Sequence, residues 1–273
     1  MKRIVVLTSS ELRHTFFRKY LALQNGVEVV ASFCESGEKN LANKITNSES
    51  EKLRHQHLQA RSQVEKDFFE LFCTYAKDES NPISIAKGTI NDPVTVEKII
   101  ALNPDVIVSY GSSIIKPTLI DAFRDRFINI HLGLSPYYRG SGTNFWPFVN
   151  NAPEFCGVTF MKIDAGIDTG EVLHQIRPRV FATDSFHVIC NRLLIDMTSE
   201  MALLLQKFDE LTPATQLEKS EKDLYYKNSD FTEASVQQLY NNFESGMLED
   251  YIANKTTRDK AVPIIENAAL AHD

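Results

Sequence analysis

The sequence is poor in the residues that metal centres, redox sites and nucleic-acid surfaces require. Its four cysteines form no CxxC pair, so neither a zinc knuckle nor a dithiol site is indicated, and no metal is expected. We interpret them as reduced core residues. The formal charge is −7, whereas proteins that neutralise phosphates on DNA or RNA need a basic surface. We therefore expect no nucleic-acid partner.

Long apolar runs and two familiar motifs are also missing. The N-terminal apolar run spans only about five residues, too few for a secretion signal or a membrane helix. We expect a cytoplasmic protein without membrane contact. The segment LTSSEL after this run is not GxGxxG, which argues against a nicotinamide-dependent oxidoreductase. No GxSxG is present, so no covalent intermediate is expected.

Short apolar runs alternate with segments of helical period, the pattern of an α/β fold with a mostly parallel sheet. Strands are predicted at 3–7, 27–33, 83–86, 105–109, 127–130, 157–163 and 172–176. Helices are predicted at 12–23, 94–102, 115–123, 185–208, 233–243 and 247–252. We expect a catalytic domain over 1–208 and a C-terminal extension over 209–273.

The segment 44–77 is too long for a simple crossover between two strands. Its apolar residues recur at helical spacing, which predicts an inserted helix. The polar face of that helix carries His55, His57, Arg61 and Glu65. We expect this face to be solvated, with contact to a substrate as the alternative.

An amide and an imidazole stand two residues apart in the run NIHLGLSPYYRG, which begins at Asn129. Asn129 and His131 point to the same side of an extended strand. The carboxyl ends of strands are where ligands bind in open α/β sheets. Taken alone, each residue is equally well explained as a satisfied polar group or a turn cap.

A second segment, GVTFMKIDAGIDTG at 157–170, places Asp164 and Asp168 in a glycine-containing loop after a strand. Asp and Gly are ordinary turn residues. The order N-x-H, P-x-Y-R-G and D-x-G-x-D-T-G is more specific. It resembles the formyltetrahydrofolate-dependent transferases, which include methionyl-tRNA, glycinamide-ribonucleotide and amino-sugar formyltransferases.

This resemblance implies a Rossmann-like formyltransferase fold and N10-formyltetrahydrofolate as cosubstrate. Position by position, Asn129, His131 and Asp168 match the family's catalytic residues. Two loops match the pterin site, at Ser113, Ile114 and Ile115 and at Ile163, Asp164 and Gly166. The chemistry suits these residue types. An amide and an imidazole can donate to a developing oxyanion, and a carboxylate can orient the imidazole during proton transfer.

Differences among the enzymes that the chain resembles suggest which amine accepts the formyl group. The methionyl-tRNA enzymes append a C-terminal barrel for tRNA, whereas the segment after Phe208 is short and acidic. The glycinamide-ribonucleotide enzymes hold phosphate with a glycine-bearing loop, and TSSELRH at 8–14 has no glycine. Arg13 or His14 is a candidate to bind the phosphate in place of that loop. Alternatively, Arg13 is a solvated residue of the helix.

The run R-G-x-x-x-N-F-W-x-F, which includes GTNFWPF at 142–148, resembles the amino-sugar group. We therefore expect transfer to the amine of a nucleotide-linked amino-deoxy sugar used in surface polysaccharides. The alternative acceptors are another small amine, a ribonucleotide, or water, the last of which would make the protein a formyltetrahydrofolate hydrolase. Core packing beneath the site is the expected role of Phe145, Trp146 and Phe148. The residues Tyr225, Tyr226 and Phe231 are candidates for nucleotide stacking or for a homodimer contact.

Overall fold

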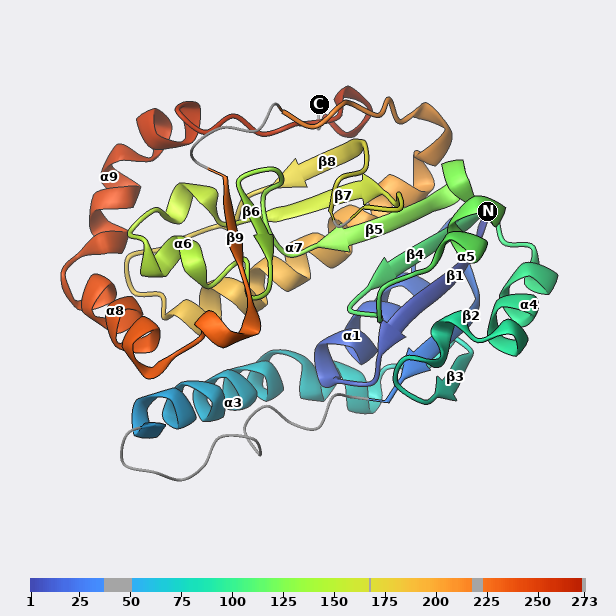
Figure 1. Ribbon diagram of the computed structural model, residues 1–273, viewed down its shortest axis with the longest axis horizontal. Helices are drawn as coiled ribbons and strands as arrows, with labels where there is room; N and C mark the ends of the chain where they lie inside the picture. The colour runs from blue at the N-terminus through green and yellow to red at the C-terminus, as the bar shows by residue number, and fades with distance from the viewer. Residues whose placement is uncertain (37–50, 167, 218–222, 272–273) are drawn as a thin grey trace.

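A sheet of seven strands in the order β3-β2-β1-β4-β5-β7-β8 runs through the computed structural model (Figure 1). The structure describes residues 1–36, 51–166, 168–217 and 223–271. The strands are β1 (Lys2–Ser9), β2 (Val27–Glu35), β3 (Pro82–Ile85), β4 (Val106–Tyr110), β5 (Phe127–His131), β7 (Val158–Lys162) and β8 (Val172–Ile176). The first five pair in parallel, whereas β7 and β8 are antiparallel to their neighbours. The predicted α/β fold with a mostly parallel sheet is confirmed.

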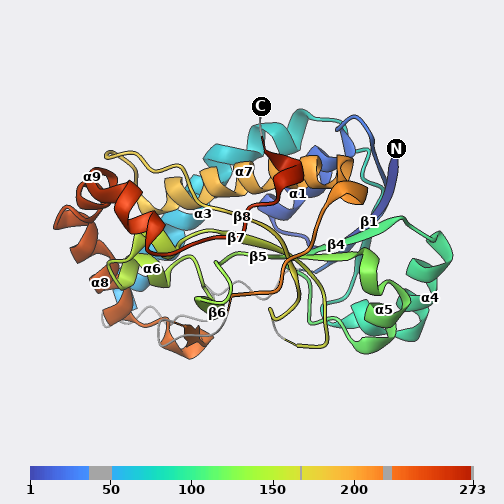
Figure 2. The same ribbon diagram turned by 90° about the horizontal axis from the view of Figure 1, so that it is seen from above.

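Helices cover both faces of this sheet because its strands are apolar on both sides. On β1, Ile4 and Val6 belong to one core cluster, and Val5 and Leu7 to the other. The first core lies beneath α1 (Leu12–Ala22), α3 (Lys52–Tyr75) and α7 (Phe186–Gln206), and the second beneath α4 (Pro93–Leu102) and α5 (Pro117–Ala122). Figure 2 shows these two helical layers on opposite sides of the strands. Strands buried on both faces read as continuous apolar runs, as the sequence does.

The inserted helix is α3, which lies along α1 and α7. Its Phe69 is fully buried, with its ring centroid 4.7 Å from that of Phe16 on α1. The predicted insert began earlier in the chain, and its residues 44–50 lie outside the described residues. Among the described residues, no helix is long and apolar enough to cross a membrane.

A smaller substructure packs at one end of the large sheet (Figure 1). It contains β6 (Tyr138–Gly140), α6 (Trp146–Val149), β9 (Leu224–Tyr226), α8 (Glu233–Glu244) and α9 (Met247–Lys260). Strand β9 pairs in parallel with β6, and α8 packs on α6 and α3. The segment after residue 208 is therefore folded back onto the rest of the chain. The sequence patterns predicted α8 and the beginning of α9, but not β6, α6 or β9.

Candidate active site

The side chains of Asn129 and His131 lie at the carboxyl end of β5, where the sheet changes from parallel to antiparallel pairing. The hydroxyl of Ser109, on the neighbouring strand β4, donates to Oδ1 of Asn129 at 2.8 Å. This bond fixes the orientation of the amide and leaves its nitrogen as a donor. Sequence reasoning did not predict this role for Ser109.

Asp168 lies beside His131, as the motif order had suggested. Its Oδ2 is 3.3 Å from Nδ1 of His131, and both side chains are largely buried. The other ring nitrogen, Nε2, is 3.1 Å from the carbonyl oxygen of Tyr138. Both ring nitrogens of His131 thus face acceptors, and only the protonated ring can donate to both at once.

The loop that carries Asp168 is held in an unusual backbone conformation. Asp168 has φ 54°, in the left-handed region. Gln216, from the segment after residue 208, donates through Nε2 to the carbonyl oxygens of Asp168 and Gly170 at 2.8 and 2.9 Å. A Cβ on Gly170 would lie 1.8 Å from the carbonyl oxygen of Lys162. The position of the carboxylate therefore depends on a glycine in contact with β7 and on a distant glutamine.

A cavity of about 180 Å³, here called the small pocket, opens beside Asn129 and Asp168. Its lining includes all six residues predicted for the pterin loops, namely Ser113, Ile114, Ile115, Ile163, Asp164 and Gly166. The fully buried Glu35 supports the first loop, accepting from the backbone N–H groups of Ser113 at 2.6 Å and Gly88 at 2.8 Å. No sequence pattern indicated this role for Glu35.

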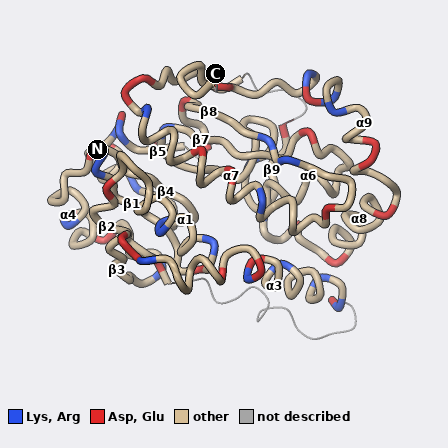
Figure 3. The backbone as a smooth tube through the Cα atoms, turned by 180° about the vertical axis from the view of Figure 1, so that it is seen from behind, with Lys and Arg blue, Asp and Glu red and all other residues tan. Residues whose placement is uncertain are grey.

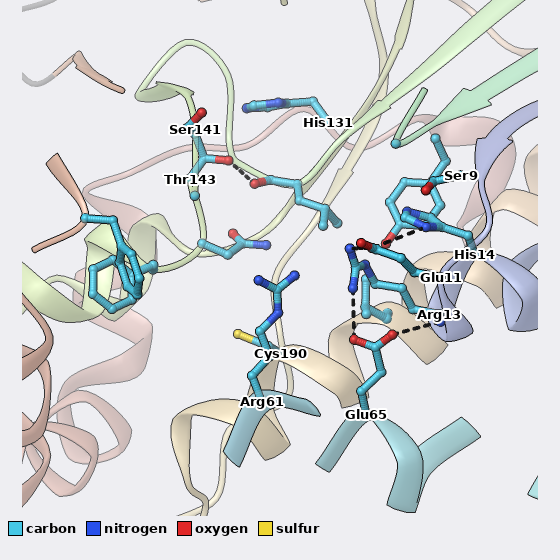
Figure 4. A pocket seen from close by; sticks show the side chains of 18 of the residues that line it. Ser9, Glu11, Arg13, His14, Arg61, Glu65, His131, Ser141, Thr143 and Cys190 are labelled. Atoms are coloured by element: carbon cyan, nitrogen blue, oxygen red, sulfur yellow. Dashed lines mark hydrogen bonds and ion pairs between the residues drawn. The ribbon is translucent and has the colours of Figure 1, made fainter. Parts of the chain in front are cut away.

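A second cavity of about 570 Å³, here called the large pocket, opens on the other side of the cluster (Figure 4). His131 lines it, and Gly111 and Ser112 line both pockets. Two of its walls come from α3, the helix between β2 and β3, and from residues 227–231 of the C-terminal segment. The two pockets therefore share a wall at Gly111 and Ser112, and Asp168 of the small pocket contacts His131 of the large one.

The expectation that the polar face of α3 is solvated was wrong for His57 and Glu65, which are buried. Arg61 is exposed and is directed into the large pocket (Figure 4). The N-terminus of α3 is capped from a distance. The carboxylate of Glu233 on α8 accepts from the backbone N–H groups of Leu53 and Arg54, each at 2.8 Å. Helical spacing could show which residues share a face, but not that a C-terminal segment would cover it.

Arg13 is neither a solvated helix residue nor a free phosphate ligand. Its guanidinium donates from Nη1 to Glu65 at 2.9 Å and from Nη2 to Glu11. Glu65 also accepts from the backbone N–H of Arg13 at 3.0 Å. His14 is buried, and burial lowers its pKa well below the usual value, which keeps the ring neutral. The charge of Arg13 is thus compensated within the protein.

Two more buried histidines form the inner wall of the large pocket. The ring centroids of His57 and His187 lie 4.5 Å apart. Burial, reinforced by the nearby Arg61, lowers the pKa of His57 to about 3 and that of His187 to about 4. Nδ1 of His57 lies 3.1 Å from the hydroxyl oxygen of Tyr240 on α8. Both rings are therefore neutral near pH 7.

The aromatic run after β6 packs as expected beneath the site. Phe145, Trp146 and Phe148 are all at most 6% exposed. Trp146 stacks on Tyr226 with ring centroids 4.1 Å apart and an interplanar angle of 6°. The ring of Tyr138 is stacked with Tyr226 as well, at 6.1 Å and 12°. Tyr226 is thus engaged in packing contacts of its own, which argues against a role in nucleotide stacking.

Comparison with known families agrees with this architecture. The family model described as formyl transferase matches residues 2–204. The chain belongs to the formyl transferase family.

Individual relatives share only part of the chain. The methionyl-tRNA formyltransferase of Citrifermentans bemidjiense is 34% identical over 129 residues, which are 45% of this chain and 40% of that protein. The chain covers less than half of the length of the curated relatives it matches.

Among solved structures, a sugar N-formyltransferase from Shewanella sp FDAARGOS_354 is similar with a TM-score of 0.54 at 19% identity, over 84% of this chain and 78% of that one. Glycinamide ribonucleotide transformylase 1 from Symbiobacterium toebii gives 0.53 at 17%, over 77% and 88%. These two likenesses establish the fold.

Proposed function

We propose that this protein is an N-formyltransferase that moves a formyl group from N10-formyltetrahydrofolate to the amine of a nucleotide-linked amino-deoxy sugar. The observation that carries this proposal is the meeting of two pockets at one polar cluster. Asn129 and Asp168 line the small pocket, and His131 lines the large one. A reaction between two bound substrates needs such a shared wall, because it brings the reacting atoms together.

The small pocket fits the folate cosubstrate by its donor set. It combines apolar side chains, among them Ile114 and Met161, with backbone groups and the carboxylate of Asp164. Asp164 accepts from the hydroxyl of Thr169 and the N–H of Gly166, which keeps the second loop closed on itself. A flat ring with amide edges matches apolar walls and backbone polar groups. When bound there, the cosubstrate supplies the formyl carbon.

The side chains of the cluster divide the chemistry among them. The amide nitrogen of Asn129 donates to the formyl oxygen as negative charge develops on it. The ring of His131 becomes a second donor when Nε2 exchanges the carbonyl oxygen of Tyr138 for the formyl oxygen. Asp168 holds the His131 ring in place through the contact at Nδ1. The incoming amine gives up a proton when it bonds to the formyl carbon. The folate nitrogen gains a proton when its own bond to that carbon breaks. Between these two events, the pair His131 and Asp168 holds the proton at the ring nitrogen.

The size and composition of the large pocket support a nucleotide-linked acceptor. Its volume of about 570 Å³ lies in the range of small-molecule sites. The loop after β1 offers the paired Glu11 and Arg13 instead of a glycine cradle, which argues against a glycinamide-ribonucleotide site. Basic residues (Lys, Arg) and acidic residues (Asp, Glu) are interspersed along the described backbone (Figure 3). That distribution supports a small acceptor over a tRNA.

A release assay tests the proposal. The purified protein is given N10-formyltetrahydrofolate with dTDP- and GDP-linked amino sugars, with glycinamide ribonucleotide, with methionyl-tRNA, or with no acceptor. We expect tetrahydrofolate to form only with an amino sugar. Release without any acceptor would instead identify a hydrolase, and release with methionyl-tRNA would identify the activity of the sequence relatives.

A further inference from the structure

Arg61 brings a positive charge to the large pocket. It projects from α3 with its guanidinium in the pocket (Figure 4). Among the described residues, no hydrogen bond or ion pair engages its side chain. The two carboxylates of the pocket wall, Glu11 and Glu65, form their ion pairs with Arg13. They act on Arg61 through their charge without a direct contact.

The pocket wall around Arg61 also offers a donor and two neutral rings. Oδ1 of Asn144, in the same pocket wall, accepts from the backbone N–H of Gly157 at 3.0 Å, so the amide nitrogen remains as a donor. Nε2 of His187, a residue only 5% exposed, has no hydrogen-bond partner among the described residues. His57 and His187 are neutral near pH 7 because burial lowers the pKa of both rings.

Arg61 is exposed, and its guanidinium lines the large pocket with no hydrogen-bond partner among the described residues, so it is available to an anionic ligand. A guanidinium forms two parallel hydrogen bonds with phosphate oxygens, and the amide of an asparagine can add a third. The ligand class that fits this arrangement is a phosphate or diphosphate group.

We propose that Arg61, assisted by Asn144, binds the phosphate group of the acceptor and so selects phosphate-linked amines over free amines. This inference rests on the proposed function and adds to it a specificity-determining residue on the inserted helix. Arg61 is separate from the reacting cluster, so its role is in binding and not in the formyl transfer itself. Glu233 contributes indirectly, because it caps the helix that carries Arg61.

Inorganic pyrophosphate serves as the probe, with binding followed by titration calorimetry. We expect the wild-type protein to bind it, Arg61→Met to lose roughly tenfold to a hundredfold in affinity, and Arg61→Lys to fall between them. Lys66→Met is the matched control, because Lys66 is an exposed residue of the same helix that does not line the pocket. It should bind as the wild type does. Circular dichroism checks that each variant is folded.

Kinetics supply the second readout. In Arg61→Met, KM for the amino-sugar acceptor should rise by a similar factor, whereas KM for N10-formyltetrahydrofolate stays unchanged and kcat changes little. Equal pyrophosphate affinity in Arg61→Met and the wild type overturns the inference, even if formyl transfer to amino sugars proceeds. Failure of the wild type to bind pyrophosphate overturns it too. Loss of pyrophosphate binding in Arg61→Met without turnover of any amino sugar refutes the proposed function and supports the phosphate site.

Discussion

Nδ1 of His131 lies 3.3 Å from Oδ2 of Asp168, across the junction of two pockets. The contact joins the end of β5 to the loop between β7 and β8. A carboxylate in this position selects the orientation of the imidazole. The proposed roles of Asn129, His131 and Asp168 all depend on this geometry.

Asn129→Ala and His131→Ala should each lower kcat by about two to three orders of magnitude, because each removes a donor to the developing oxyanion. Neither side chain fills the apolar core, so the melting temperature should change by only a few degrees. The measurements are steady-state kinetics and thermal denaturation by circular dichroism. Near wild-type turnover in a folded variant would contradict these roles.

Asp168→Asn should change the pH profile of kcat as well as its magnitude, since a neutral amide replaces the carboxylate that takes part with His131 in the proposed proton transfer. Gln216→Leu tests the support of the same loop. It removes the two bonds to the Asp168 and Gly170 carbonyl oxygens and leaves the carboxylate present. We expect a lower rate with the wild-type pH profile in Gln216→Leu. An identical profile in Asp168→Asn and the wild type would count against the proton-transfer role.

The cap on α3 gives a prediction about the large pocket. Glu233→Gln removes the charge that accepts from the backbone N–H groups of Leu53 and Arg54. This should cost about 1 kcal/mol of stability and raise the acceptor KM, while the folate KM stays the same. Glu244→Gln is the matched control, because Glu244 is exposed on the same helix α8. Equal effects of the two substitutions would contradict a specific capping role.

The stack of Trp146 on Tyr226 can be followed by fluorescence, because Trp146 is the single tryptophan of the chain. Tyr226→Leu should alter the emission of Trp146 and lower stability by roughly 1 kcal/mol. Tyr225→Leu provides the comparison, since Tyr225 is the adjacent residue of β9 and is 55% exposed. Its emission should match that of the wild type. A large change in Tyr225→Leu with none in Tyr226→Leu would refute this account of the wall.

The neutral histidines predict a loss of stability in acid. The pKa of His187 is about 4 in the folded protein against an ordinary 6.5. Between these values the unfolded chain binds the extra proton, so the free energy of unfolding falls as the pH falls. The slope is about 1.4 kcal/mol per pH unit for one such histidine. Stability that is complete above pH 6.5 should therefore decline toward pH 4.

Denaturant unfolding at pH 7.5 and pH 5 measures this effect. His187→Gln should lose less stability than the wild type between the two values, because one titrating group is gone. Between pH 7.5 and 8.5 the difference in stability between the variant and the wild type should stay constant, since this histidine is neutral in both states. An equal acid loss in His187→Gln and the wild type would show that His187 is not held neutral by burial.

The sequence predicted the architecture because the fold depends on patterns of neighbouring residues. Apolar runs located all seven strands of the large sheet, and helical spacing located α1, α4, α5, α7 and α8. Strands β6 and β9 were missed because each has only three residues and each is stabilised by the other, far away in the chain. The extent of α9 was underestimated, since its second half, NKTTRDK, is polar and its residues are largely exposed.

The candidate site was predictable only in part. Its motif residues lie at strand ends and in glycine loops, where sequence patterns are strongest. The walls of the large pocket were not predictable, because they depend on how α3 meets the C-terminal segment. Arg61 illustrates the difference: the helical spacing placed it on a polar face, and only the structure shows that this face lines a pocket. Ser109 and Glu35 were missed for the same reason, since their partners come from other strands and loops.

The most direct test of the central claim is a mass spectrum of the acceptor. A nucleotide-linked amino sugar is incubated with N10-formyltetrahydrofolate and either the wild-type protein or the His131→Ala variant. The account predicts that the wild type adds one formyl unit to the amine and that His131→Ala adds almost none. An unmodified sugar in the presence of folded wild-type protein, or equal formylation by the variant, would contradict it.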